Sequence, residues 1–537
     1  MKKIVSILIF AAVSMAALAV PARRDGFVCI GADGTEKMVW QHGNEDFHYM
    51  TDAEGNWLDE ETLLPLTEAE KGERLAVSGE RKMRKAAQQT MVGGEPNIAP
   101  RGLIIMVNFQ NQAFVTPHDT VDSMMNGANF TRHYSYSYDY NGKHYEGTVN
   151  SSGSARRYFQ DQSYGQYNPV FDVVGPYTVS SNYEVYGKNG SSGSDSNVGQ
   201  LIKEACQLAD QNGANFTLYD NDQDGYVDFV YVIYAGEGEA DGGGANTIWP
   251  HNYKLNYWGL YCTVDGKKIN NYACSNEINH YGGSYAGIGT FVHEFGHVIG
   301  LPDIYPTNNA THKTNGEWDI MDYGPYNNDG NTPPGYSAYE RFYCGWLTPR
   351  VLRKAENTTL RTIDNQEALL LCSGDMHNLS GYDPNPATFY LLEARKKEGW
   401  DAHIPGEGMM ITKIAYNSYK WENNQVNNTA GSLGIDILEA DGKAPSYISG
   451  TDNGYLGKPG DLFPTGATEW TAFANHEITD ITKDADGTIH FKYRGGTSTE
   501  MVSVQHSEIS IQKVLKDGRV LILRGGKTYD ILGHENR

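Results

Sequence analysis

Apolar and polar positions divide this chain into segments of different periodicity. The continuous apolar runs 103–109 and 229–234 are typical of strands buried on both faces, and apolar positions recur at helical spacing over 154–161 and 197–210. After about residue 350 the apolar runs become short and turn residues separate them, as around 388–392. The pattern predicts an α+β fold. We expect a first domain over residues 96–350 and a β-rich, sandwich-like domain over 351–496.

The two ends of the chain have patterns of their own. Lys2 and Lys3 precede a short apolar run and the small residues around Ala19, which predicts a secretory signal peptide over 1–19. A short membrane anchor is the alternative, but the run is too short to span a bilayer comfortably, so we expect no transmembrane segment. Residues 497–537 are expected to form a C-terminal tail of strand, turn and strand. This tail resembles the sorting signals of secreted Bacteroidetes proteins, and a plain terminal hairpin is the alternative.

Residues 20–95 differ from the residues after them in their pattern of apolar and charged positions. They contain a strand-like stretch, an acidic helical stretch and, near their end, a basic cluster at 81–85 followed by Gly93, Gly94 and Pro96. A basic, helix-breaking junction in an exported chain is typical of a protease-accessible linker. The segment is therefore predicted to be a propeptide, the alternative being an ordinary N-terminal domain that stays attached.

Charge and composition narrow the choice of partners. The chain has 43 Lys and Arg against 66 Asp and Glu, a formal charge of −23, and such a surplus repels the phosphates of nucleic acids and anionic membranes. We expect no nucleic-acid partner. An apolar fraction of 39% together with 60 glycines is ordinary for a globular protein and argues against global disorder. We expect a monomer.

The strongest chemical signal is an HExxH motif formed by His293, Glu294 and His297. Four residues apart on a helix, the two histidines face the same side and can share one metal ion, and imidazole nitrogen suits Zn²⁺. Gly300 is expected to end the helix in a left-handed turn, which returns Asp303 to the metal as the third ligand. Glu294 is expected to act as general base on a metal-activated water. The alternative is a surface helix with two structural histidines.

A second element lies at 318–324, Trp-Asp-Ile-Met-Asp-Tyr-Gly. It resembles the Met-turn of metzincins, in which Met321 would form an apolar floor beneath the imidazoles. Tyr323 resembles the tyrosine that approaches zinc in astacins and serralysins, and it is expected to donate a hydrogen bond to the developing oxyanion. A tyrosine used only for packing is the alternative.

The HExxHxxGxxD spacing and the Met-turn, together with the stretches 158–163, 173–177, 389–395 and 399–401, resemble the immune inhibitor A family of secreted bacterial metallopeptidases. The resemblance implies a zinc endopeptidase made as a prepro-protein, with a metzincin-like catalytic domain and a β-rich partner domain. It also implies that the propeptide acts as an intramolecular inhibitor. Asp303, where most metzincins have histidine, is this family's usual third ligand.

A third cluster is an acidic loop over 220–228. Asp220, Asp222, Asp224 and Asp228 occupy positions 1, 3, 5 and 9, Gly stands at position 6, and Tyr226 supplies the carbonyl position. Oxygen ligands at this spacing match a calcium-binding loop, although the glutamate that completes an EF-hand is absent. We expect a structural Ca²⁺ site, the alternative being a solvated acidic turn.

These features together predict a secreted zinc-dependent endopeptidase that hydrolyses extracellular proteins or peptides. A hypothesis from another class is a surface adhesin or glycan-binding protein with a structural or vestigial zinc site, in which the β-rich half does the work. A closer alternative is a peptidase restricted to glycosylated proteins. The intact Glu294 argues against a purely structural zinc site, because such a site has no use for a base and closes its fourth position with another ligand.

Overall fold

The computed structural model describes most of the chain between residues 27 and 536. The described residues are 27–30, 36–44, 47–59, 62–72, 101–140, 143–190, 195–221, 223, 225–279, 284–308, 310, 312–443, 457–497, 512–516, 519–524, 527–529 and 535–536.

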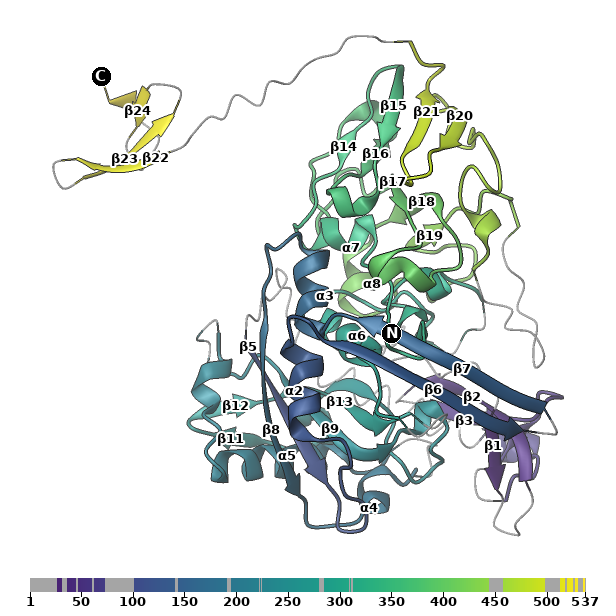
Figure 1. The fold of residues 1–537 in the computed structure, drawn as a ribbon, viewed down its shortest axis with the longest axis vertical. Coiled ribbons are helices and arrows are strands. Elements are labelled where there is room, and N and C mark those ends of the chain that lie inside the picture. Colours follow the sequence, from purple (N-terminus) through teal and green to yellow (C-terminus); the bar gives the residue numbers. More distant parts are fainter. Residues whose placement is uncertain are drawn as a thin grey trace, which may run out of the picture.

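A five-stranded sheet forms the base of the first half of the molecule (Figure 1). Its strand order is β10 (His251–Lys254), β13 (Asn271–Ile278), β9 (Val230–Glu237), β5 (Arg101–Asn108) and β8 (Val170–Thr178). The last four strands are parallel, whereas β10 runs antiparallel to β13. The two apolar runs of the sequence are the central strands β5 and β9, as predicted. Being buried on both faces, they have no polar alternation.

Helices cover both faces of this sheet. Along β5, Leu103 and Ile105 point into a cluster with α5 (Val198–Gln211), while Ile104 and Met106 point into the opposite cluster. That second cluster also contains side chains of α2 (His118–Asn126), α3 (Ala155–Gln162) and α6 (Gly289–Val298). The helical spacing of 154–161 and 197–210 therefore corresponds to α3 and α5, and the predicted α+β character is confirmed.

Smaller elements complete this half. They are the hairpin of β6 (Thr131–Tyr140) and β7 (Lys143–Ser152), the short α4 (Tyr183–Gly187), the pair β11 (Cys262–Val264) and β12 (Lys267–Ile269), and α7 (Ala338–Tyr343).

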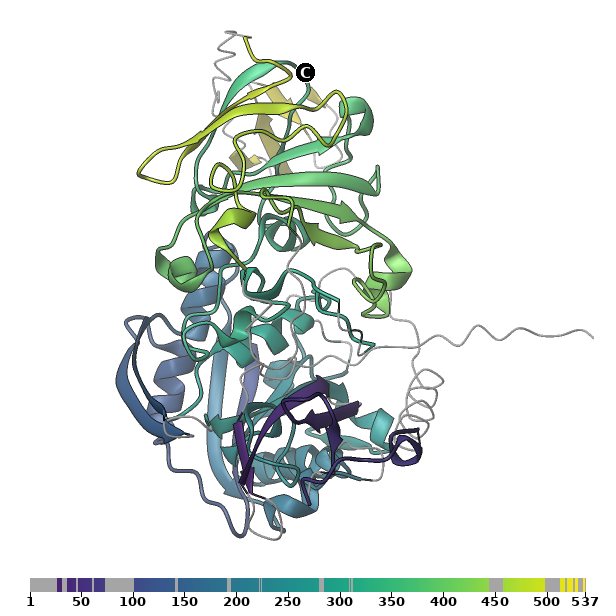
Figure 2. The ribbon, with the colours of Figure 1, turned by 90° about the vertical axis from the view of Figure 1, so that its right-hand side faces the viewer.

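Between residues 350 and 497, the described part of the C-terminal half contains two sheets (Figure 2). The larger has the order β14 (Arg350–Val351), β16 (Leu369–Cys372), β17 (Thr388–Arg395), β18 (Gly408–Ala415) and β19 (Ile435–Ile437). The smaller has the order β15 (Glu356–Leu360), β21 (Ile489–Tyr493) and β20 (Ile478–Lys483), and the short helix α8 (Ser418–Glu422) comes after β18.

The larger of these sheets is buried on both faces. In β16, Leu369 and Leu371 pack into a cluster shared with the three-stranded sheet, whereas Leu370 and Cys372 belong to the same cluster as α3 and α6. Because side chains alternate along a strand, one sheet joins both cores. The β-rich half is thus packed against the first half through a continuous apolar interface.

The ends of the chain are described only in part. Four antiparallel strands precede the first half, β1 (Phe27–Ile30), β2 (Glu36–Asn44), β3 (Phe47–Thr51) and β4 (Trp57–Leu58). Another four-stranded sheet, β22 (Gln512–Lys516), β23 (Arg519–Arg524), β24 (Lys527–Tyr529) and β25 (Glu535–Asn536), lies in the predicted tail. The expected signal peptide and the basic cluster at 81–85 lie outside the described residues, so the predicted domain divisions stay predictions. No helix within the described ranges is long and apolar enough to cross a membrane.

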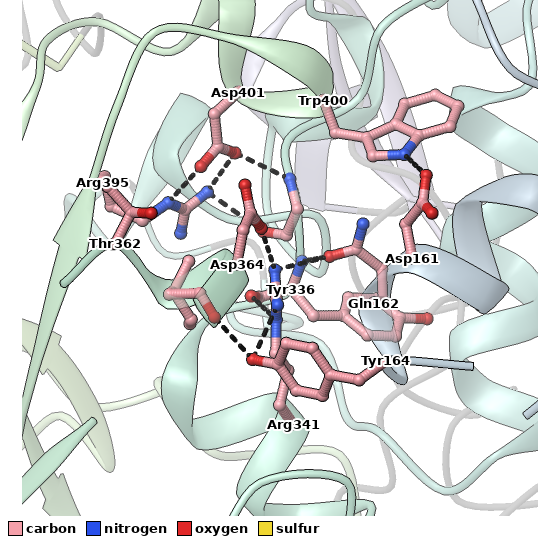
Figure 3. A network of polar contacts seen from close by, with 12 residues as sticks. Asp161, Gln162, Tyr164, Tyr336, Arg341, Thr362, Asp364, Arg395, Trp400 and Asp401 are labelled. Atoms are coloured by element: carbon pink, nitrogen blue, oxygen red, sulfur yellow. Dashed lines mark hydrogen bonds and ion pairs between the residues drawn. The ribbon is translucent and has the colours of Figure 1, made fainter. Parts of the chain in front are cut away.

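A buried polar network connects the two halves (Figure 3). Arg395 in β17 is fully buried and binds Asp401 through two bonds, Nε to Oδ2 at 2.6 Å and Nη2 to Oδ1 at 2.5 Å. It also donates from Nη1 to Glu393 Oε1 at 3.0 Å and from Nη2 to the carbonyl of Gly335 at 3.1 Å. Gly335 returns a hydrogen bond from its amide to Asp401 at 2.9 Å. The guanidinium therefore fastens the β-rich half to the segment that leads into α7.

The same network brings together stretches that are far apart in sequence. Trp400 donates from its indole nitrogen to Asp161 Oδ2 at 3.0 Å and packs edge-on against Tyr158 with ring centroids 5.0 Å apart. Gln162 Oε1 accepts from Arg341 and from the amide of Tyr336 at 2.8 and 2.9 Å. Two of the stretches on which the family resemblance rests, 158–163 and 399–401, thus meet at the interface between the halves.

Replacing Arg395 should expose how much this network stabilises the fold. In Arg395→Met, Asp401 and Glu393 keep their burial but lose the cation, and breaking a buried ion pair in this way costs about 3–5 kcal/mol of unfolding free energy. Urea denaturation measures the change. Arg361→Met is the control, because its partner Glu367 is solvent-accessible and little change is expected there. Equal, small effects in both variants would contradict a stabilising network.

Candidate metal centre

Helix α6 presents the two histidines of the HExxH motif from consecutive turns. His293 and His297 lie with ring centroids 4.9 Å apart, and both side chains are almost completely buried. Gly300 comes after the helix with φ of +96°, a conformation that disfavours residues with a Cβ. The turn it makes leads the chain back to Asp303. His293, His297 and Asp303 contribute three ligand atoms that all lie within 4.8 Å of one another.

Hydrogen bonds on the far side of each ring determine which nitrogen faces this cluster. His293 Nδ1 lies 2.7 Å from the carbonyl oxygen of Ile320, and His297 Nδ1 lies 2.8 Å from that of Leu301. A carbonyl oxygen can only accept, so each Nδ1 carries the proton in these bonds. Each Nε2 is then left with a lone pair directed towards Asp303, which is the tautomer that binds metals.

The donor set fits a zinc ion. Asp303 Oδ1 lies 3.2 Å from His293 Nε2 and 3.4 Å from His297 Nε2. Two ligands about 2.0–2.1 Å from a tetrahedral zinc ion are separated by roughly 3.3 Å. Within the described part of the chain, these three atoms are buried and have no hydrogen-bond partner.

The predicted Met-turn lies directly beneath helix α6. Met321 is fully buried, and a Cβ placed on Gly296 would come within 2.7 Å of its sulfur, so the thioether touches the helix between the two histidines. The turn is anchored by Asp319, whose carboxylate accepts from the amide of Met321 at 2.8 Å. Met321 in turn accepts from the amide of Ile304 at 2.8 Å. The turn therefore touches both the helix and the segment that carries Asp303.

Glu294 and Tyr323, the two residues predicted to act in catalysis, lie in different surroundings. Glu294 is fully buried in α6, near Tyr231 of β9, where burial together with the Glu294 charge raises the pKa of the Tyr231 hydroxyl well above its ordinary value. Tyr323 is half-buried and lies at the start of the short 3-10 helix Gly324–Tyr326, just after the Met-turn. The general-base role of Glu294 and the oxyanion role of Tyr323 stay predictions.

Part of the predicted calcium loop can be located. Asp220 Oδ2 accepts from Lys267 Nζ at 2.5 Å, and Asp228 Oδ2 accepts from the amide and the side chain of Asn221, both at 2.7 Å. Tyr226 is 41% exposed. Asp222 and Asp224 lie outside the described residues. Of the two described aspartates, Asp220 is already paired with a lysine, and calcium binding stays a prediction.

One contact to the metal-ligand cluster could not be anticipated from the motif. Asn424, just after α8 in the C-terminal half, donates from Nδ2 to Asp303 Oδ2 at 2.5 Å and accepts from the amide of Asp303 at 2.6 Å. The only sequence signal is the amide-rich run 423–428, Asn-Asn-Gln-Val-Asn-Asn, which has no spacing characteristic of a site. The separation of 121 residues is what hides the contact.

Comparison with known proteins finds relatives of the first half of the chain. Residues 88–346 match the sequence model described as immune inhibitor A peptidase M6, catalytic domain. The pre-pro-metalloprotease PrtV of Vibrio cholerae serotype O1 (strain M66-2) is 29% identical over 220 residues, covering 35% of this chain and 23% of that protein. Immune inhibitor A of Bacillus thuringiensis subsp. alesti is 28% identical over 257 residues, covering 39% of this chain and 36% of that protein. Most of each relative's length therefore lies outside the match. The matched segment contains α6, Asp303 and the Met-turn, and it ends before the β-rich half.

Proposed function

Residues 88–346 belong to the immune inhibitor A family of metallopeptidases, and from this premise we propose that the chain is a secreted zinc-dependent endopeptidase acting on extracellular proteins. The observation that carries the proposal is the convergence of His293 Nε2, His297 Nε2 and Asp303 Oδ1 within 4.8 Å. Two neutral imidazoles and one carboxylate are a set that catalytic zinc sites use, with one position left for water.

The residues around the cluster have separate tasks in this proposal. Zinc held by His293, His297 and Asp303 would supply Lewis acidity to the scissile carbonyl and to the attacking water at neutral pH. Glu294, adjacent to His293 on α6, takes the proton from the attacking water and returns it to the leaving amine. Tyr323 donates a hydrogen bond to the oxyanion that develops on the substrate carbonyl.

The packing of the β-rich half argues for a peptidase rather than an adhesin. Its larger sheet is covered on one face by the three-stranded sheet and on the other by the core that contains α6. A sheet used in this way supports the first half and does not offer an open face for a ligand. The alternatives of an adhesin and of a peptidase restricted to glycosylated proteins gain no comparable support.

The proposal includes the processing of the chain. Residues 1–19 would be removed as a signal peptide, and residues 20–95 would act as an inhibitory propeptide. The name of one relative, pre-pro-metalloprotease, supports this organisation. The C-terminal segment 497–537 is proposed as a sorting tail for the cell surface.

Removing the proposed base tests the mechanism. In the processed protein, Glu294→Gln should lower the rate of casein hydrolysis by about 10²–10⁴-fold while zinc stays bound, because the amide cannot accept the proton. Hydrolysis by the unmodified protein should stop with a zinc chelator and return with added zinc.

The matched control is Glu398→Gln, an exposed glutamate outside α6 that pairs with Lys396, which should hydrolyse casein at the unmodified rate. Full activity in Glu294→Gln, or activity that persists in the chelator, would refute the proposal.

We also propose that the loop 220–228 binds a structural calcium ion. Calcium that binds only the folded chain should raise the melting temperature by mass action. The shift should appear with Ca²⁺ but not with equal Mg²⁺, and Asp220→Asn should abolish it. Identical melting curves with either ion would show that the loop is a solvated turn.

A further inference from the structure

The amide of Asn424 makes two hydrogen bonds to a single residue, Asp303. The backbone amide of Asp303 can only donate, so it must meet the Oδ1 of Asn424, at 2.6 Å. The Nδ2 group must then face the carboxylate, and it lies 2.5 Å from Asp303 Oδ2. The orientation of this side-chain amide is therefore determined by its partners, and both of its polar atoms hold the same residue.

These bonds decide which oxygen of Asp303 faces the histidines. Because Oδ2 is occupied by Asn424, Oδ1 is the oxygen that lies 3.2 Å from His293 Nε2 and 3.4 Å from His297 Nε2. A fully buried carboxylate without such a donor could rotate or turn away from the cluster. A hydrogen bond to the outer oxygen favours a single-oxygen contact with a metal ion and restricts the rotation of the carboxylate.

The segment around Asn424 is itself fastened to the segment around Asp303. Asn427 Nδ2 donates to the carbonyl of Ile304 at 2.9 Å, and Asn428 Oδ1 accepts from the amide of Thr307 at 2.7 Å. Thr307 Oγ1 donates to the carbonyl of Asn424 at 2.6 Å. Asn424, Asn427 and Asn428 thus bind successive positions of the segment 303–307, and we call this set of hydrogen bonds the asparagine ladder. Asn424 has φ of +50°, a left-handed conformation that asparagine tolerates better than most residues.

We propose that Asn424 is a positioning residue for the metal ligand Asp303, so that the β-rich half completes the metal centre. This rests on the proposed zinc site. Asn424 lies beyond residue 346, where the match to the family's catalytic domain ends. The C-terminal half therefore contributes to metal retention and not only to the stability of the fold.

Zinc affinity of the full chain tests this proposal. Asn424→Gly keeps the left-handed backbone accessible and removes the side chain, and Asn424→Ser retains a polar side chain too short to span both contacts. Asn428→Ala is the matched control, because it removes the hydrogen bond to the amide of Thr307 in the same ladder and leaves both contacts of Asn424 with Asp303 in place. Each protein is stripped of metal, its melting temperature is recorded, and its zinc affinity is measured by competition with a chromogenic chelator. The visible absorption of the cobalt-loaded protein reports the ligand geometry independently.

Both Asn424 variants should bind zinc about 10–100-fold more weakly than the unmodified chain and should change the cobalt spectrum. Asn428→Ala should keep the parent affinity and spectrum. Parent affinity in Asn424→Gly and Asn424→Ser would overturn the proposal, and so would an equal loss in Asn428→Ala, since docking of the loop would then hold the ligand. A parent chain that binds no zinc would instead contradict the proposed function.

Discussion

The carboxylate of Asp303 is fully buried, so the surrounding structure has to replace the hydration that it loses. An isolated buried carboxylate is strongly disfavoured unless charges or hydrogen bonds replace its hydration. Two imidazoles from α6 face one oxygen and the amide of Asn424 faces the other. A divalent cation between the imidazoles and Oδ1 would complete this compensation. The requirement links a helix, a turn and a distant loop into one site.

The two halves of the molecule are joined by apolar packing as well as by polar contacts. The family match ends at residue 346, yet the cluster that contains α6 continues into β16, β17 and β18. The ion pair of Arg395 with Asp401 fastens this sheet to Gly335, and the ladder around Asn424 fastens the loop after α8 to Asp303. Apolar packing brings the halves together, and the polar contacts set their register to the precision that a metal ligand requires.

Local parts of this arrangement could be predicted from the sequence. The spacing of His293 and His297 is a property of any helix, and the positive φ of Gly300 is expected from its place after the last turn. The strands β5 and β9 and the helices α3 and α5 were predictable because their apolar periodicity is strong. The position of Met321 beneath the helix was predictable only through resemblance to a family.

Other parts could not be predicted from the sequence. The contacts of Asn424 with Asp303 and of Trp400 with Asp161 join residues 121 and 239 positions apart, and no local pattern encodes such pairs.

The proposed zinc centre is tested most directly by a crystal structure of the processed protein with anomalous data collected at the zinc edge. One zinc peak is expected about 2.0–2.2 Å from His293 Nε2, His297 Nε2 and Asp303 Oδ1. Casein cleavage by a protein with no zinc at these atoms, or with zinc bound elsewhere, would contradict the proposed metal centre.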